Sequence, residues 1–247
     1  MQTILITGCS SGFGRETARC FLDRGWTVVA TMRRPREDVL PPSDCLRVLS
    51  LDVTDPASIK QAVAAAGPID VLVNNAGIGW LNALEGTPMT AAREVFETNT
   101  LGLIAMTQAV LPQMRERRAG VIVNVSSSTT LRSLPLLSVY TATKAAVNAF
   151  TMSLALELEP FGIRTRLVLP GRAPGTSFAS NARTRMGGGF PDAYAELAQR
   201  LMAGMQGDST VTHSPDVAEA VWRAATDPSC PMRLPAGADA IAWAEAH

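Results

Sequence analysis

Tyr140 and Lys144 stand four residues apart in a chain that contains only two tyrosines and two lysines. The surrounding segment, 139–161, has the pattern of a helix, and side chains four residues apart lie on one helical face. An ammonium group beside a phenol favours the phenolate and lowers the pKa of the tyrosine below its ordinary value of about 10. A tyrosine tuned in this way can act as a general acid and base. The pair therefore marks the predicted centre of the chemistry.

The composition argues against several other classes of protein. The 247 residues carry a formal net charge of +0 with 47% hydrophobic residues, which disfavours a nucleic-acid-binding or membrane-surface protein. No apolar run approaches the roughly 20 residues that a membrane helix needs. The two histidines, His213 and His247, are too few and too far apart for a zinc site or a histidine-based triad, so we expect no metal.

The cysteines and the first strand suggest a compartment. The four cysteines show no C-x-x-C spacing and no clustering, which is typical of thiols in a reducing environment. A strand pattern already begins at Thr3, which leaves no room for a signal peptide. We therefore expect a cytoplasmic protein.

Short β-rich segments alternate with helical patterns along the chain. Several of the β-rich segments are apolar almost throughout, as expected of parallel strands covered on both faces. Strands are predicted at Thr3–Thr7, Thr27–Thr31, Leu46–Leu51, Asp70–Val73, Val121–Val125, Arg164–Val168 and Met232–Leu234. Helices are predicted at Gly14–Arg24, Pro56–Ala66, Thr90–Arg118, Val139–Glu159 and Pro215–Ala225. The alternation predicts one α/β domain over residues 1–247, a Rossmann-type doubly wound parallel sheet of about seven strands with helices on both faces.

Residues 171–212 interrupt this alternation. The segment is long, and the glycine-rich run Met186-Gly187-Gly188-Gly189-Phe190 lies inside it. An insertion of this size in a compact domain is more often a functional lid than a passive loop. We therefore predict that residues 171–212 form a substrate lid.

A glycine-rich turn follows the first predicted strand. Glycines at Gly8, Gly12 and Gly14 permit a tight turn and let backbone N–H groups approach a pyrophosphate at the start of a helix. The spacing is G-x-x-x-G-x-G, and its position after the first strand of an α/β chain indicates a dinucleotide site. The alternative is an ordinary glycine-rich turn between a strand and a helix.

The end of the second predicted strand indicates which dinucleotide binds. An acidic residue at this place usually holds the 2′-hydroxyl of NAD, but the chain here reads Met32-Arg33-Arg34. The guanidinium of Arg33 or Arg34 could bind a 2′-phosphate, which favours NADP(H) over NAD(H). The hydroxyls of Ser10 and Ser11 are weaker candidates for the same phosphate. The alternative is that both arginines are solvated loop charges.

These features together resemble the short-chain dehydrogenase/reductase family over nearly the whole chain, nearest its hydroxysteroid and retinol dehydrogenase branch. The resemblance rests on the glycine turn, on Asp52-Val53, on Asn74-Asn75-Ala76-Gly77, on Tyr140-x-x-x-Lys144 and on Pro170-Gly171. It implies the catalytic residues Asn99, Ser127, Tyr140 and Lys144. It implies that the cofactor contacts are Gly8, Ser10, Ser11, Gly12, Phe13, Gly14, Arg33, Asp52, Val53, Asn75, Ala76, Gly77, Tyr140, Lys144, Pro170, Gly171 and Thr176.

The resemblance also implies a role for each catalytic residue. Tyr140 would exchange a proton with the substrate oxygen while the nicotinamide exchanges a hydride with the carbon. Ser127 would bind the same oxygen, although a shift of one residue would put Ser126 or Ser128 in its place. Lys144 would tune Tyr140 and hold the nicotinamide ribose, and Asn99 would hold a water that resupplies the proton. The run 172–175 departs from the family pattern beside Thr176.

We therefore expect an NADP(H)-dependent oxidoreductase that interconverts a carbonyl and an alcohol. Apolar residues near the lid suit a bulky hydrophobic substrate, although they could equally pack the core: Trp80, Leu131, Leu134, Leu136, Leu137, Phe178, Met186 and Phe190. The alternative function is a non-catalytic dinucleotide-binding sensor or scaffold on the same fold. The resemblance further implies a homodimer or homotetramer formed through the helices predicted at 90–118 and 139–159.

Overall fold

The computed structural model describes residues 2–186, 189–207 and 210–246, and it confirms the predicted fold class. Within these ranges the strands form one parallel sheet in the order β3-β2-β1-β4-β5-β6-β7. The strands are β1 Thr3–Ile6, β2 Thr27–Met32, β3 Leu46–Ser50, β4 Val71–Asn74, β5 Gly120–Val125, β6 Ile163–Pro170 and β7 Arg233–Ala236. The chain starts in the middle of the sheet and builds outward in both directions, so the order reverses beside β1 and β4, where ligands bind in such sheets.

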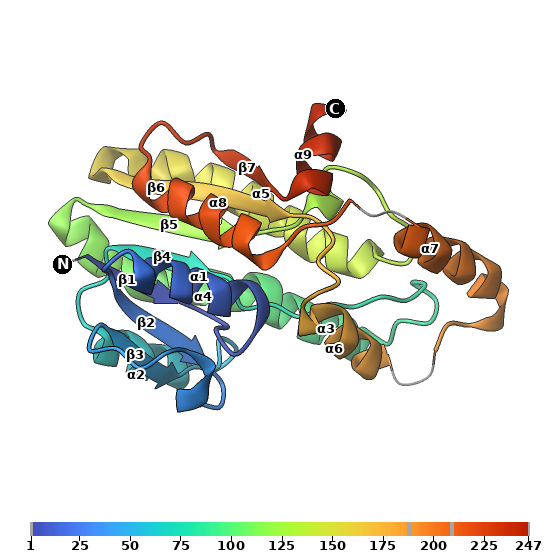
Figure 1. Cartoon of the computed structure of the whole chain (residues 1–247), viewed down its shortest axis with the longest axis horizontal. Helices are drawn as coiled ribbons and strands as arrows, with labels where there is room; N and C mark the ends of the chain where they lie inside the picture. The colour runs from blue at the N-terminus through green and yellow to red at the C-terminus, as the bar shows by residue number, and fades with distance from the viewer. Residues whose placement is uncertain (1, 187–188, 208–209, 247) are drawn as a thin grey trace.

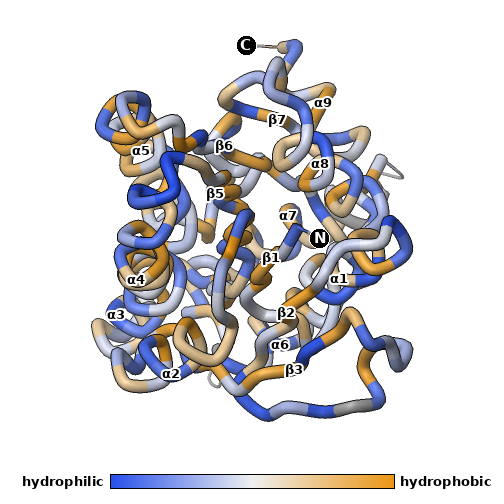
Figure 2. The backbone as a smooth tube through the Cα atoms, turned by 90° about the vertical axis from the view of Figure 1, so that its left-hand side faces the viewer, coloured by the Kyte–Doolittle hydropathy of each residue, from blue (hydrophilic) through white to orange (hydrophobic). Residues whose placement is uncertain are grey.

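Helices cover both faces of the sheet, as the apolar strands require (Figure 2). On one face lie α1 (Gly12–Asp23) and α8 (Ser214–Thr226), whose apolar side chains join one core with the strands. On the other face lie α2 (Pro56–Ala66), α4 (Gly102–Arg117) and α5 (Ser138–Leu158) over a second core. Leu5 and Leu72 are 0% exposed between these layers, which explains why the central strands carry almost no polar residues.

One predicted helix is interrupted in the structure. The segment expected as a single helix over Thr90–Arg118 consists of α3 (Met89–Phe96), a π-helical turn at Glu97–Leu101 and α4. A π-turn inserts an extra residue into the helix and often occurs at functional sites, because it turns a side chain toward a new direction. The residue at the middle of this turn is Asn99.

The segment predicted to form a lid contains two helices, α6 (Ser177–Met186) and α7 (Ala195–Gly207). Both lie at one end of the sheet, on the right of Figure 1, away from the layers that cover its faces. Residues 187, 188, 208 and 209 of the lid lie outside the described ranges. The final helix α9 (Ala238–Glu245), which the sequence did not predict, follows β7.

Two further findings concern the environment of the protein. No helix in the described ranges combines the length and the apolar character needed to cross a membrane. Cys9, Cys20 and Cys230 are free thiols, and Cys9 and Cys230 are buried. Burial raises the pKa of the Cys9 thiol to about 12, so this thiol is an inert part of the core.

Candidate active site

The glycine turn between β1 and α1 has the close contacts that only glycine allows. Gly8 and Gly12 have φ of +77° and +57°, a region that side chains with a Cβ rarely adopt. A Cβ on Gly14 would lie 2.4 Å from the carbonyl oxygen of Gly8. The three glycines therefore curl the chain into an open cradle of backbone groups at the start of α1. Such a cradle fits a dinucleotide pyrophosphate.

The segment after β4 is hydrogen-bonded to the start of the glycine turn. The Thr7 hydroxyl accepts hydrogen bonds from the backbone N–H groups of Asn75 and Ala76, at 3.0 and 2.9 Å. The Asn75 amide donates to the carbonyl oxygens of Thr7 and Gly8, at 2.8 and 3.2 Å. These bonds join the carboxyl ends of neighbouring strands β1 and β4, so the order of the sheet brings the two motifs together.

Tyr140 and Ser127 meet at the carboxyl end of β5. Tyr140 lies in the first turn of α5, and Ser127 precedes the short 3₁₀ turn Ser128–Thr130 that follows β5. Their hydroxyls are hydrogen-bonded to each other, and the two residues are 8% and 7% exposed. Of its two neighbours, Ser126 donates instead to the carbonyl oxygen of Lys144 at 3.2 Å, and Ser128 is buried in the 3₁₀ turn. The geometry thus favours Ser127 among the three serines.

Burial dominates the electrostatics of this pair. It raises the pKa of Tyr140 to about 12, and the hydrogen bond from Ser127 offsets this only in part. The prediction that Lys144 lowers this pKa is therefore wrong, because burial raises it instead. The Lys144 ammonium donates to the carbonyl oxygen of Val125 at 3.0 Å, and burial lowers its own pKa to about 8.

The low pKa of Lys144 predicts a dependence of stability on pH. The ordinary value for lysine is 10.5, so above pH 8 the folded protein releases a proton that the unfolded chain retains. The charge on buried Lys144 therefore destabilises the folded protein at pH 8 and below. This loss of stability is recovered as the pH rises from 8 toward 10.5. Relative to Lys144→Met, the wild type should gain about 1 kcal/mol in free energy of unfolding between pH 7 and pH 9.

Urea unfolding of both proteins at the two pH values measures this gain. Lys60→Met is the matched control, because it removes the other lysine of the chain, which is exposed on α2. A difference between wild type and Lys144→Met that stays constant from pH 7 to pH 9 would contradict the prediction.

The side chain of Asn99 is buried and lies close to Lys144. Its side chain is 0% exposed, accepts from the N–H of Ile78 at 2.8 Å and donates to Ile78 O at 2.9 Å and to Thr143 Oγ1 at 3.2 Å. A Cβ on Gly77 would lie 3.2 Å from Asn99 Oδ1 and 3.6 Å from Lys144 Nζ. The π-turn thus places the Asn99 amide beside the ammonium group, on the same side of Gly77.

A single cleft of about 1120 Å³ connects these parts. It is bordered by nearly every predicted site residue: Gly8, Ser10, Ser11, Gly12, Phe13, Arg33, Asp52, Val53, Asn75, Ala76, Gly77, Ser127, Tyr140, Lys144, Pro170, Gly171 and Thr176. Gly14 and Asn99 do not border it, because Gly14 packs against Gly8 and Asn99 is buried behind Gly77. The cleft therefore unites the predicted cofactor and catalytic sets.

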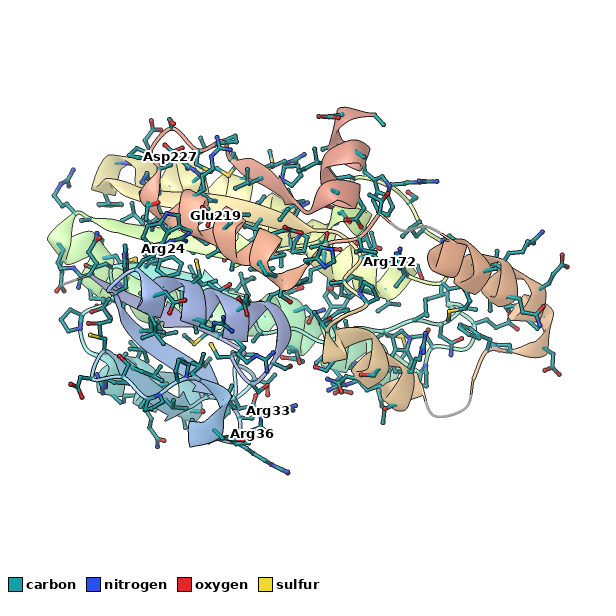
Figure 3. All side chains as sticks on the ribbon, in the orientation of Figure 1. Arg24, Arg33, Arg36, Arg172, Glu219 and Asp227 are labelled. Carbon is teal, nitrogen blue, oxygen red and sulfur yellow. The ribbon has the colours of Figure 1, made fainter. Side chains whose placement is uncertain are left out.

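Arg33 lies at the far end of this cleft, just past the end of β2 (Figure 3). Its side chain is exposed and faces Asp52, whose pKa is lowered mainly by hydrogen bonds from Thr54 and to a smaller extent by the charge of Arg33. Arg34 is not among the described residues that border the cleft. Of the two candidate arginines, Arg33 is thus the one that borders the cleft.

Helix α6, in the segment predicted to form a lid, begins beside the glycine turn and Tyr140. The hydroxyls of Ser177 and Ser11 are 2.8 Å apart, which joins the start of α6 to the glycine turn. A Cβ on Gly12 would lie 3.5 Å from Thr176, so this threonine lies close to the glycine turn. The Phe178 ring stands edge-on to Tyr140, with centroids 5.7 Å apart.

The apolar residues proposed for substrate binding divide into two groups. Trp80, Leu134, Leu137 and Phe178 border the cleft. Leu136 and Phe190 pack instead into a small core with Ala83 and Ala198 under α7, and Leu131 lies outside the cleft. The side chain of Met186 is outside the described part of the structure. The sequence alone could not separate these groups, because both are apolar and close along the chain.

Arg132 and Trp243 are among the cleft residues that were not predicted from the sequence. The Arg132 guanidinium lies 5.4 Å from the centroid of the Trp243 ring, and both side chains border the cleft. Trp243 belongs to α9, more than one hundred residues away in the sequence, and no local motif marks it. An exposed arginine on the loop after β5 likewise gives no signal by itself.

Comparison with known proteins places the chain among dehydrogenases. The model of the short chain dehydrogenase family matches residues 2–187. NADP-dependent 3-hydroxy acid dehydrogenase YdfG of Escherichia coli K12 is 37% identical over 243 residues, which cover 92% of this chain and 90% of that protein. Retinol dehydrogenase 8 of Homo sapiens is 40% identical over 181 residues, 69% of this chain and 58% of that protein. The crystal structure of a short-chain dehydrogenase from Streptomyces avermitilis, 35% identical, superposes with a TM-score of 0.84 and covers 100% of this chain and 91% of that one.

Proposed function

The chain belongs to the short chain dehydrogenase family, as its motifs predicted, and we propose that it is an NADP(H)-dependent oxidoreductase that interconverts a carbonyl compound and an alcohol. The observation that carries this proposal is the meeting of Tyr140, Ser127 and Lys144 in the cleft that also contains the glycine cradle. A site that only bound a dinucleotide would not need a hydroxyl pair aimed into the other half of the cleft.

Tyr140 and Ser127 perform complementary tasks in this proposal. The nicotinamide dinucleotide, when bound, supplies or accepts the hydride. Ser127 binds the substrate oxygen and stabilises the negative charge that develops on it. Tyr140, protonated because of its raised pKa, donates its proton to that oxygen in reduction and takes it back in oxidation. Phe178 and Leu137 border the cleft here, and the Phe178 ring gives Tyr140 an apolar neighbour.

Lys144 and Asn99 support the proton transfer. A positive charge on Lys144 stabilises the Tyr140 phenolate that remains after proton donation. Both amide hydrogens of Asn99 are donated to Ile78 and Thr143, so Asn99 would hold the water that returns the proton through its oxygen, which lies on the same side of Gly77 as the ammonium group. Titration of the purified protein with NADPH and then a panel of hydrophobic ketones and aldehydes tests the proposal: binding without turnover of any carbonyl or alcohol would contradict it.

The preference for NADP(H) rests on Arg33. We expect Arg33→Ala to weaken NADPH binding about tenfold or more and to leave NADH binding nearly unchanged, because a charge-assisted bond to the 2′-phosphate is lost. Nucleotide fluorescence measures both affinities. Arg34→Ala is the matched control, since Arg34 does not border the cleft. Equal affinities of the wild type for NADPH and NADH would count against the preference, which the NADP-dependent relative YdfG supports.

We also propose a cytoplasmic homodimer or homotetramer formed through α4 and α5. On these helices and the adjoining π-turn, the large apolar side chains of Leu101, Met152 and Leu156 are 48%, 44% and 73% exposed. Exposed apolar side chains of this size favour contact with a second subunit. Light scattering at micromolar concentration should show a dimer or tetramer, and Leu156→Asp should shift it toward the monomer. A monomeric wild type would contradict the assignment.

A further inference from the structure

The two ends of the lid meet at one buried carboxylate. The chain leaves the sheet at Gly171, directly after β6, and the segment predicted as a lid ends at Thr212, two residues before α8. Asp239, in the first turn of α9, lies between these two points and is 4% exposed. Figure 3 places the neighbouring residue Arg172 at this junction between the sheet and the lid helices.

Both oxygens of Asp239 are bonded to the ends of the lid. One accepts from the backbone N–H of Arg172 and the other from the hydroxyl of Thr212, each at 2.6 Å. The ends are also bonded to each other: Gly171 N–H donates to the Thr212 hydroxyl at 2.9 Å and Thr212 N–H to Arg172 O at 2.8 Å. A buried carboxylate is costly unless donors satisfy it, so these bonds are expected to persist in the folded protein.

Two glycines make this junction possible. A Cβ on Gly171 would lie 2.1 Å from Asp239 Oδ1, and a Cβ on Gly237 would lie 2.0 Å from Thr212 Oγ1. Gly237 also has φ of +95°. Gly171 of the Pro170-Gly171 motif therefore has a structural role in addition to its predicted cofactor contact. Only a glycine at this position lets the Asp239 carboxylate approach the backbone where the lid begins.

The junction lies close to the reacting groups along the chain. Thr176, Ser177 and Phe178, which approach Gly12, Ser11 and Tyr140, follow Arg172 by four to six residues. Because so few residues separate them, a shift of Arg172 would also shift Thr176, Ser177 and Phe178. Tyr140, Ser127 and Lys144 are on α5 and after β5, and none of their hydrogen bonds given above involves Asp239.

We propose that Asp239 is a positioning residue that holds both ends of the lid and thereby sets α6 over the glycine turn and Tyr140. The proposal rests on the proposed function only for its kinetic readout. Removal of the carboxylate is expected to release the start of α6, so that nucleotide and substrate bind less tightly while the proton-transfer groups stay in place.

Hydrogen exchange of the whole protein tests the anchor without any turnover. In Asp239→Ala, amides of residues 173–186 should exchange about tenfold faster or more, while those of β4 and β5 stay protected. Asp239→Asn should restore most of the protection, because its amide oxygen can still accept from Arg172 while Thr212 donates to Ala236 O, 3.0 Å away. Asp216→Asn is the control, since Asp216 accepts from the N–H of His213 at the start of α8 and not from the lid.

Steady-state kinetics separate positioning from a purely structural role. We expect the KM for NADPH to rise about tenfold in Asp239→Ala with a much smaller change in kcat, whereas a loss of folded enzyme lowers kcat and leaves KM unchanged. If Asp239→Ala does not fold, Thr212→Val and Thr212→Ser decide, because only serine keeps the hydroxyl between Asp239 and Gly171. Wild-type exchange in residues 173–186 of Asp239→Ala, or equal behaviour of the two Thr212 variants, would overturn the proposal. If the wild type turns over no carbonyl, the proposed function fails, and exchange alone still tests the anchor.

Discussion

Tyr140→Phe is expected to lower kcat by roughly three orders of magnitude while NADPH binding changes little. The phenol hydroxyl is the group that exchanges a proton with the substrate oxygen, and phenylalanine keeps the ring but not the proton. The ring contact with Phe178 and the burial of the side chain do not require the hydroxyl, so the site should keep its shape. Stopped-flow measurement of NADPH oxidation with an accepted carbonyl gives the rate, and nucleotide fluorescence gives the affinity.

The same experiment tests whether the protein is an enzyme at all. A dinucleotide-binding sensor on this fold would bind NADPH equally well in wild type and variant and would turn over substrate in neither. Unchanged turnover in Tyr140→Phe would instead show that a group other than Tyr140 transfers the proton. Ser127→Ala separates these cases further, because it removes the hydrogen-bonding partner of Tyr140 without touching the tyrosine.

Gly14→Ala should destroy the dinucleotide cradle. The added methyl group would lie 2.4 Å from Gly8 O and 2.5 Å from the Asn75 amide nitrogen, and neither the turn nor the strand end below it can move freely. Overpacking of this kind costs about 1–3 kcal/mol of stability, and we expect NADPH binding to be lost as well because the backbone N–H groups shift. Thermal unfolding with and without NADPH measures both effects.

A second glycine provides the control for this prediction. Gly175→Ala adds the same methyl group where no atom lies within 4 Å, so the free energy of unfolding should stay close to that of the wild type. A Gly14→Ala protein that still gains stability from added NADPH would show that the turn is not the pyrophosphate site.

The sequence by itself determined the fold class and predicted a set of residues most of which border one cleft. Apolar strands alternating with helices require a covered parallel sheet, and each strand was located to within two residues of its bounds in the structure. The glycine turn, the Asn75 segment, and Tyr140 with Lys144 are local patterns whose residues are close along the chain. Each of these motifs follows a strand, and parallel strands bring all their carboxyl ends to one edge of the sheet. The motifs therefore lie close together in the structure.

The tertiary structure alone decided the rest. Whether Tyr140 has a lowered or a raised pKa depends on burial by residues such as Phe178, which no spacing rule reveals. The π-turn at Asn99 departs from regular helix geometry without any breaker in the sequence. Trp243 and Asp239 reach the cleft from the last helix because β7 pairs with β6 and returns the chain to the site. The periodic pattern of apolar residues depends only on residues that are close along the chain. Desolvation and long-range hydrogen bonds depend instead on which distant segments pack together.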